Sequence, residues 1–374
     1  MSNHAKIQAE EGAGARARRP DRDGWLWRRR ALVGAVMLLG GSQLGAVGGC
    51  CRPVINSSPE FRWWLFSNFG ASMICPEMLK IGLPLRLQDR GAAIGRYFPA
   101  QCSVDVDNQN KLVTVNFAGT GYAWHTLTKR IGFSAVASVQ YRVDFYLGEE
   151  DLYLWAKSNG IPNGPSFRLG YVENPIADIA TGATPLGIVA NYFGNQIVAG
   201  ELTRGFTVIH NPDKGNDFAL GVLTPPQRPN HPFNVLQNEY FTYANETVEV
   251  HSNQRDFIGP FEVAEPGQRL FVRYFLQGTP VDVALVDKAT GDLWRDAYQT
   301  GRPLGPPPGQ VLGGAPLMPG QELRTAYNPP PGSYYIVIDN SPAWGAVAPP
   351  VSVLNPILDP VATLSYVVQL SGVD

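Results

Sequence analysis

Glycine and proline are the residues that most limit what this chain can fold into. The 374 residues include 40 Gly and 32 Pro, together about 19% of the chain where about 12% is usual. In a helix interior, Gly costs about 1 kcal/mol and Pro about 3 kcal/mol relative to Ala. A helical bundle and a coiled coil are therefore excluded, and short strands joined by turns are favoured. Aromatic residues make up 11% of the chain, which is enough to build a core and excludes a disordered chain.

The first fifty residues have the parts of an export signal. Three arginines at 28–30 precede an uncharged stretch, 31–49, that is rich in Leu, Val and Gly and ends at Cys50. A basic region, an apolar region and small residues before the cleavage site are typical of such a signal. Residues 47–50, Val-Gly-Gly-Cys, resemble a bacterial lipobox. The resemblance implies diacylglycerol on the Cys50 sulfur, cleavage of residues 1–49, and acylation of the new N-terminus, for example with palmitate.

An uncleaved transmembrane anchor is the alternative interpretation of residues 31–49, since nineteen such residues can just span a bilayer. Six of them are Gly, however, and a Cys follows small residues at the expected place. Removal of residues 1–49 leaves 22 basic and 28 acidic residues, so the mature chain is mildly acidic and has no electrostatic footprint for nucleic acid. We expect a lipid-anchored protein of the bacterial cell envelope, at the outer membrane.

The remaining cysteines predict one disulfide. With Cys50 lipidated, Cys75 and Cys102 are the natural pair in an oxidising compartment. Pairing with Cys51, or two separate buried thiols, is the alternative. No Cys-x-x-Cys motif occurs, which argues against a zinc ribbon and a thioredoxin-type site.

A helix is predicted soon after the tether formed by residues 50–58. Ser58 is a typical N-cap, Pro59 suits the first helical position, and an acidic residue follows in the first turn. The next residues are largely aromatic. Trp63, Trp64 and Phe66 are candidates for contact with the membrane interface close to the lipid. The alternative is that this helix is buried in the core of the domain.

Residues 59–240 are predicted to form an α+β domain with a long, curved antiparallel sheet and one or two helices. Alternating apolar and polar residues predict hairpins at 102–117 and 204–223. The alternation at 135–147 is long enough to predict an extended, curved strand. Helical spacing of apolar residues predicts a helix at 184–200.

Residues 245–374 are predicted to form a β-sandwich or jelly roll, so the fold class is mainly β. Strands are expected at 270–276, 281–286, 334–338 and 363–370, with a turn at 287–291. The segments at 261–268, with its Pro-Gly-Gln turn, and 330–338, with Pro-Gly-Ser-Tyr-Tyr, resemble the edges of a pre-peptidase C-terminal or GOLD-like β-sandwich. The resemblance implies an accessory binding or adaptor module.

No catalytic motif accompanies this architecture. After export four His remain, none at the spacing of a zinc protease, and a Gly-x-Ser-x-Gly elbow is absent. Acidic residues at 105–107 and 149–151 fit solvated turns better than calcium ligands. We therefore expect no metal and no cofactor.

The sequence favours a non-enzymatic envelope lipoprotein that acts as a scaffold or binding module. Its partners would be the membrane, through the lipid, and other envelope proteins. A carrier of lipid or another apolar ligand is the first alternative, because a curved sheet around the apolar segment 176–202 could form a pocket. A hydrolase with a dispersed site is the second.

Overall fold

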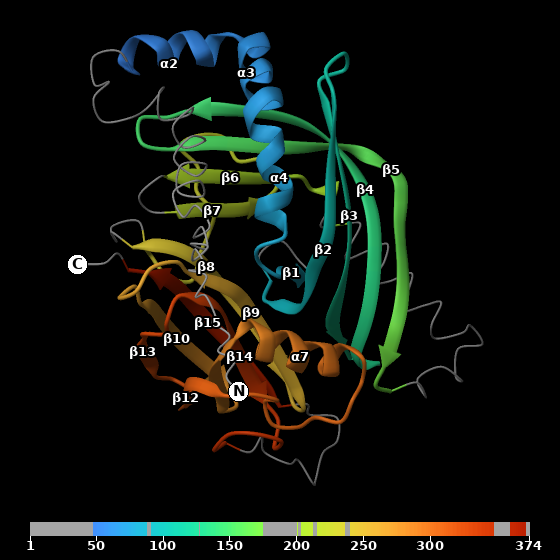
Figure 1. Cartoon of the computed structure of the whole chain (residues 1–374), viewed down its shortest axis with the longest axis vertical. Helices are drawn as coiled ribbons and strands as arrows, with labels where there is room; N and C mark the ends of the chain where they lie inside the picture. The colour runs from blue at the N-terminus through green and yellow to red at the C-terminus, as the bar shows by residue number, and fades with distance from the viewer. Residues whose placement is uncertain are drawn as a thin grey trace, which may run out of the picture. The chain divides into compact units, whose positions relative to one another are not determined.

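The computed structural model describes residues 48–87, 91–126, 128–174, 200, 203–211, 215–235, 240–347 and 360–371. The chain divides into two compact units, Met1–Cys51 and Arg52–Asp374, and the architecture below concerns the second. This unit is mainly β, as predicted, with few helices (Figure 1). The helix expected at 184–200 lies almost entirely outside the described residues.

Eleven strands form one large sheet that contains segments far apart in the sequence. Its order is β1-β2-β3-β4-β5-β6-β7-β8-β15-β10-β13. The sheet curls, so that β2 and β8 also pair directly between Ala93 and Val248. The strands are β1 (Leu83–Arg86), β2 (Ala93–Asp107), β3 (Leu112–His125), β4 (Lys129–Leu147), β5 (Leu152–Val172), β6 (Phe206–Asn211), β7 (Gly215–Leu220), β8 (Phe241–His251), β10 (Leu270–Gly278), β13 (Glu322–Tyr327) and β15 (Val361–Leu370).

The two predicted hairpins and the long strand are confirmed. β2 and β3 pair through Asp107, whose carboxylate accepts hydrogen bonds from the backbone N–H groups of Gln109 and Asn110 in the turn. β6 pairs with β7. β4 is 19 residues long, and its alternate residues from Ala135 to Tyr141 are buried while residues between them are more exposed. Figure 1 shows β4 and β5 bending strongly along their length.

Four more strands form a second sheet with the order β12-β11-β14-β9. They are β9 (Gln254–Val263), β11 (Val281–Asp287), β12 (Val311–Leu317) and β14 (Gly332–Asn340). One face packs against β8, β10 and β15 in a core that includes Tyr274, Ile336 and Leu364. The opposite face packs against a helix and against β2 and β3. Burial on both faces explains why β11 and β14 read as continuous apolar runs.

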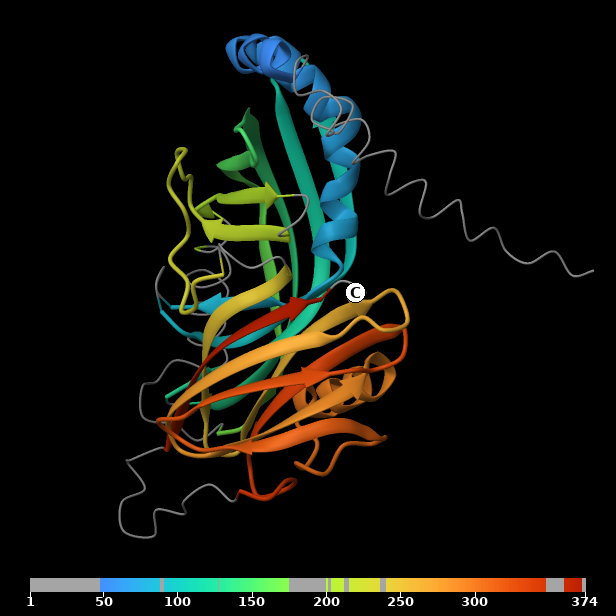
Figure 2. The ribbon, with the colours of Figure 1, turned by 90° about the vertical axis from the view of Figure 1, so that its left-hand side faces the viewer.

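The predicted N-terminal helix is present and packs against the large sheet. α2 (Gly48–Ser57) is followed by α3 (Pro59–Leu65), a π-helical turn η1 (Phe66–Gly70) and α4 (Ala71–Met78). The Ser58 Oγ accepts a hydrogen bond from the Phe61 backbone N–H, which confirms the predicted cap. Both views show α3 and α4 lying against the long strands of the sheet, and α4 contacts β2 (Figures 1 and 2).

The expected turn at 287–291 is wrong, because these residues begin a helix, α7 (Lys288–Gln299). Asp287 is its N-cap, and its carboxylate accepts a hydrogen bond of 2.7 Å from the Thr290 backbone N–H. Gly291 lies in the first turn against the Tyr335 ring. The four strands expected in this part of the chain are all present, as β10, β11, β14 and β15.

The predicted division into segments 59–240 and 245–374 is not visible as a break in the sheet. β8 begins at Phe241, between the two segments, and pairs with β15 on one side and with β7 at one position on the other. The division therefore stays a prediction, and residues 52–374 form one compact unit.

Candidate functional site

Cys50 lies in α2, within its first turn. The neighbouring Cys51 is a free, partly buried thiol. Among the residues that the structure describes, no helix has the length and apolarity needed to cross a membrane. The lipid on Cys50 stays a prediction from the sequence.

Cys75 and Cys102 form a disulfide, as predicted. Their Cα atoms are 5.4 Å apart, and the bond joins α4 to β2 across 27 positions of the sequence. In the chain-entropy description, closing a loop of this length contributes about 3 kcal/mol. The bond therefore fixes the helical segment against the sheet.

The three aromatic candidates on this segment face in different directions. Trp63 and Phe66 are buried against the sheet, and the Trp63 indole N–H donates to the Asn108 side chain at 3.1 Å. Trp64 is 51% exposed on the outward side. The segment is thus buried on one face and open on the other, and contact of the open face with the membrane stays a prediction.

The inward face of α3 is also held by charge. The Arg62 guanidinium donates two hydrogen bonds to the Asp144 carboxylate on β4, at 2.7 and 3.0 Å. The Asn56 side chain pairs with both backbone groups of Leu147, at the end of the same strand. These contacts, with the disulfide, give the helical segment one orientation on the sheet.

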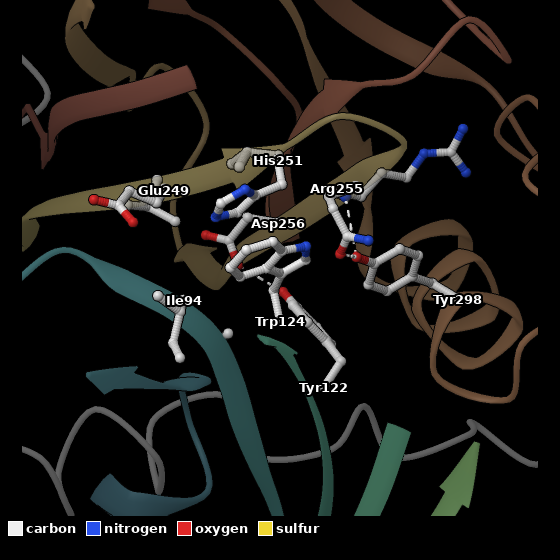
Figure 3. Close-up of a pocket in the computed structure, with 12 residues that line it drawn as sticks. Ile94, Tyr122, Trp124, Glu249, His251, Arg255, Asp256 and Tyr298 are labelled. Atoms are coloured by element: carbon white, nitrogen blue, oxygen red, sulfur yellow. Dashed lines mark hydrogen bonds between the residues drawn. The ribbon is translucent and has the colours of Figure 1, made fainter. Parts of the chain in front are cut away.

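A small cleft, with a cavity volume of about 10 Å³, lies where the long strands meet the second sheet (Figure 3). It is smaller than the roughly 300–1,000 Å³ of typical ligand sites. The Trp124 and His251 rings are stacked with centroids 3.3 Å apart, and Figure 3 shows both in the cleft. The lining combines polar and apolar side chains from β2, β3, β8, β9 and α7, among them Ile94, Tyr122, Trp124, Glu249, His251, Asp256 and Tyr298.

Beside the cleft, Arg96 of β2 is the centre of a buried polar network. Its side chain is 1% exposed, and its Nε donates to both oxygens of Asp256, at 2.9 and 3.0 Å. Its Nη2 donates to the Tyr366 hydroxyl at 2.7 Å and to the Glu246 carboxylate at 3.3 Å. Its Nη1 donates to the Gly82 carbonyl at 3.3 Å. The guanidinium therefore connects β2 to β8, β9 and β15.

Two tyrosines complete the network. The Tyr122 hydroxyl donates to Asp256 at 2.7 Å and accepts from the Phe257 backbone N–H at 2.7 Å. The Tyr366 hydroxyl donates to Glu246 at 2.8 Å. Burial, followed by the charge of Asp256, raises the pKa of the Tyr122 phenol well above its ordinary value. Burial likewise raises the pKa of the Tyr366 phenol well above its ordinary value. Both phenols therefore keep their protons at neutral pH and act as hydrogen-bond donors.

Glu246 remains a carboxylate in this setting. Burial alone would raise its pKa, but Arg96, Arg86 and the hydrogen bond from Tyr366 outweigh burial and hold the pKa below its ordinary value. A buried charge needs such partners, because an unpaired one is very unfavourable. Asp256 thus joins β2 to the second sheet, and Glu246 joins β2 to β8 and β15 within the large sheet.

A second buried ion pair lies nearby, on the second sheet. Arg255 donates to the Asp339 carboxylate, with 2.9 Å between Nη2 and Oδ2, and its guanidinium lies 4.6 Å from the Trp294 ring centroid. The Tyr298 hydroxyl accepts from the Arg255 backbone N–H at 3.2 Å. These contacts attach α7 to β9 and β14. Among the described residues, no group of three or more His, Cys, Asp or Glu side chains is arranged to hold a metal ion.

Sequence reasoning did not identify this network. Its members come from five strands, and the side chains that Arg96 contacts lie 150 to 270 positions away in the chain. The available signal was a charge inside an apolar strand. Arg96 is the one charged residue in the buried run from Ala93 to Phe98, and Asp256 comes directly before the buried residues Phe257 and Ile258.

Comparison with known proteins identifies no family for this chain. No known protein family matches the sequence, and no curated protein matches it. Among solved structures, a glycoside hydrolase family 43 arabinoxylan arabinofuranohydrolase from Bacillus subtilis, in complex with cellotetraose, matches at 11% identity with a TM-score of 0.23. The match covers 72% of this chain and 66% of that one, which is just under two thirds. A likeness this weak carries no argument about function.

Proposed function

We propose that this chain is a lipid-anchored, non-enzymatic binding module of the bacterial cell envelope. Its mature form begins at Cys50, which carries the lipid and attaches the protein to the outer membrane. Residues 52–374 present the β-rich unit to other envelope proteins. The lipobox-like segment 47–50 supports the anchor, and the organisation of the acidic groups supports the non-enzymatic role.

The observation that carries the non-enzymatic role is the engagement of Asp256 and Glu246 by Arg96. A general acid or base must reach a substrate and exchange a proton with it. Here Arg96 and Tyr122 engage both oxygens of Asp256, while Arg96 and Tyr366 both bond to Oε2 of Glu246. The pKa of Glu246 is lowered because Arg96, Arg86 and Tyr366 together outweigh burial. Such groups favour rigidity of the junction between the sheets over catalysis.

Affinity purification of the full-length protein from native membranes tests the binding role. Mass spectrometry of the eluate then identifies the proteins and extracted lipids that accompany it. We expect an envelope protein at near-stoichiometric yield. Bound lipid without a protein partner, apart from the covalent anchor, would contradict the proposal and favour a lipid carrier.

The anchor is tested separately by metabolic labelling with a radioactive fatty acid. We expect the label on the wild-type protein and on Cys51→Ser, and its loss from Cys50→Ser. The Cys51→Ser variant is a matched control because it removes the adjacent thiol. A wild-type protein without label would refute the anchor.

A further inference from the structure

The outward face of the helical segment carries three aromatic rings in contact with one another. Phe61 is 39% exposed, Trp64 51% and Phe69 37%. The Phe61 and Trp64 rings are stacked with centroids 5.8 Å apart, and the Phe69 ring meets Trp64 edge-on at 5.9 Å. We call Phe61, Trp64 and Phe69 the aromatic ridge. A contiguous exposed apolar surface of this kind marks an interaction site.

The π-helical turn η1 explains how three rings come to lie on one face. In a regular α-helix, residues five apart point in clearly different directions, because each residue turns by about 100°. The wider π turn, in which the Ala71 N–H bonds to the Phe66 carbonyl, reduces this difference. It brings Phe69 under Trp64 and keeps Phe66 on the buried side. Turns of this type occur frequently at functional sites.

The segment that bears the ridge is almost free of charge. From Phe61 to Pro76 the single charged residue is Arg62, and Asp144 holds its guanidinium on the inner side. The polar side chains between the rings bond to the helix itself. Asn68 Nδ2 and Ser67 Oγ both donate to the Trp64 carbonyl, at 2.8 and 3.2 Å. Moving this surface into a less polar medium therefore leaves few donors unpaired.

The position of the ridge in the chain identifies what it contacts. Phe61 follows Cys50 by eleven residues, which even fully extended span at most about 40 Å. Most of these residues lie in α2, where the rise is only about 1.5 Å per residue. A lipid on Cys50 therefore keeps the ridge close to the bilayer surface. Trp and Phe are residues favoured at that interface.

We propose that the aromatic ridge inserts into the boundary between headgroups and acyl chains of the bilayer that holds the Cys50 lipid. This second contact fixes the orientation of the β-rich unit on the membrane, because the disulfide and Arg62 hold the helical segment rigidly on the sheet. The inference rests on the proposed lipid anchor. It replaces Trp63 and Phe66, which are buried, with Phe61 and Phe69 as the membrane-facing partners of Trp64.

Quenching of tryptophan fluorescence by brominated lipid tests the ridge. The mature lipoprotein is reconstituted into vesicles of phosphatidylethanolamine and phosphatidylglycerol, with and without brominated acyl chains. The Trp64 signal is the difference between the wild-type protein and Trp64→Phe. We expect bromination to lower this signal about two-fold. The matched control, Trp155→Phe on β5, should leave the bromine-dependent quenching unchanged.

The outcomes separate the ridge from the anchor. Equal bromine quenching of wild type and Trp64→Phe, in a protein that carries the fatty-acid label, would overturn the ridge and leave the anchor intact. Absence of the label would overturn the anchor. Loss of a protein partner in the Trp64→Ser variant, with no bromine quenching of Trp64, would overturn the membrane assignment in favour of a protein-binding surface. Thermal unfolding of each variant within about 2 °C of wild type shows that the fold is kept.

Discussion

Arg96 joins the large sheet to the second sheet through its buried ion pair with Asp256. Arg96→Met removes the cation from two carboxylates and leaves Asp256 buried without an opposite charge. Breaking a buried pair in this way costs about 3–5 kcal/mol. We expect a loss of this size in the free energy of unfolding, measured by urea denaturation.

The control for this substitution is Arg142→Met on β4, which is separated from β2 by β3 in the same sheet. Arg142 is exposed and donates a hydrogen bond to Asn159. Exposed substitutions usually change stability by less than about 0.5 kcal/mol. Equal effects of the two variants would show that the Arg96 network does not stabilise the fold.

His231 gives the stability a pH dependence. Its ring contacts the Asp217 carboxylate, and although burial alone would lower the pKa of His231, the hydrogen bond and charge of Asp217 raise it above the ordinary value. The stabilisation is therefore complete below about pH 6.5 and is lost as the pH rises through the raised pKa. We expect His231→Gln to lower the melting temperature more at pH 5.5 than at pH 8.5. A difference that is the same at both pH values would contradict this.

At the residue scale, the sequence predicted a specific contact only where few residues could form it. Cys75 and Cys102 could be paired because just four cysteines occur and Cys50 was assigned to the lipid. The Arg96 network could not be predicted, because its partners are brought together by the pairing of β2 with β8 and by the packing of the second sheet against the large one. Short-range sequence patterns carry no information on such long-range contacts.

At the scale of elements, α7 shows how packing overrides propensity. Ala is a better helix former than Gly by about 1 kcal/mol, but a Cβ at Gly291 would lie 2.2 Å from the Tyr335 ring. We therefore expect Gly291→Ala to destabilise the protein by about 1–3 kcal/mol. Gly305→Ala, where no atom lies within 4 Å of the added Cβ, is the control. Calorimetry measures both, and a stabilised Gly291→Ala protein would disprove the packing argument.

The disulfide defines a second prediction for an element. The double variant Cys75→Ser/Cys102→Ser releases α4 from β2, and we expect a loss of about 3 kcal/mol. Limited proteolysis should then cut first within residues 66–82. Cys51→Ser, which leaves the bond intact, should behave as wild type. Cleavage elsewhere, at an unchanged rate, would mean that the bond does not hold the helical segment.

Elements with a clear period were predictable from the sequence. The hairpins and β4 follow from alternation, since each has one face toward a core and one toward solvent or a helix. α7 was missed because Asp287 and Gly291 resemble turn residues, although Trp294 and Tyr298 lie four positions apart on one buried face. The π turn was not foreseen, and it depends on the packing of Phe66 against Gly70.

At the scale of the whole molecule, the large sheet includes strands from both halves of the chain. Because the Arg96 network also connects these halves, we expect residues 52–374 to unfold in one transition. Circular dichroism and tryptophan fluorescence should report the same midpoint. Two separate transitions would indicate that segments 59–240 and 245–374 are independently stable domains.

The proposed function depends on the lipid at Cys50, and mass spectrometry of the N-terminal peptide from the protein in native membranes tests it most directly. We expect a mature chain that begins at Cys50, with the mass of a diacylglyceryl group and an amide-linked acyl chain added to that residue. A peptide that continues from residues 31–49 into an unmodified Cys50 would contradict it.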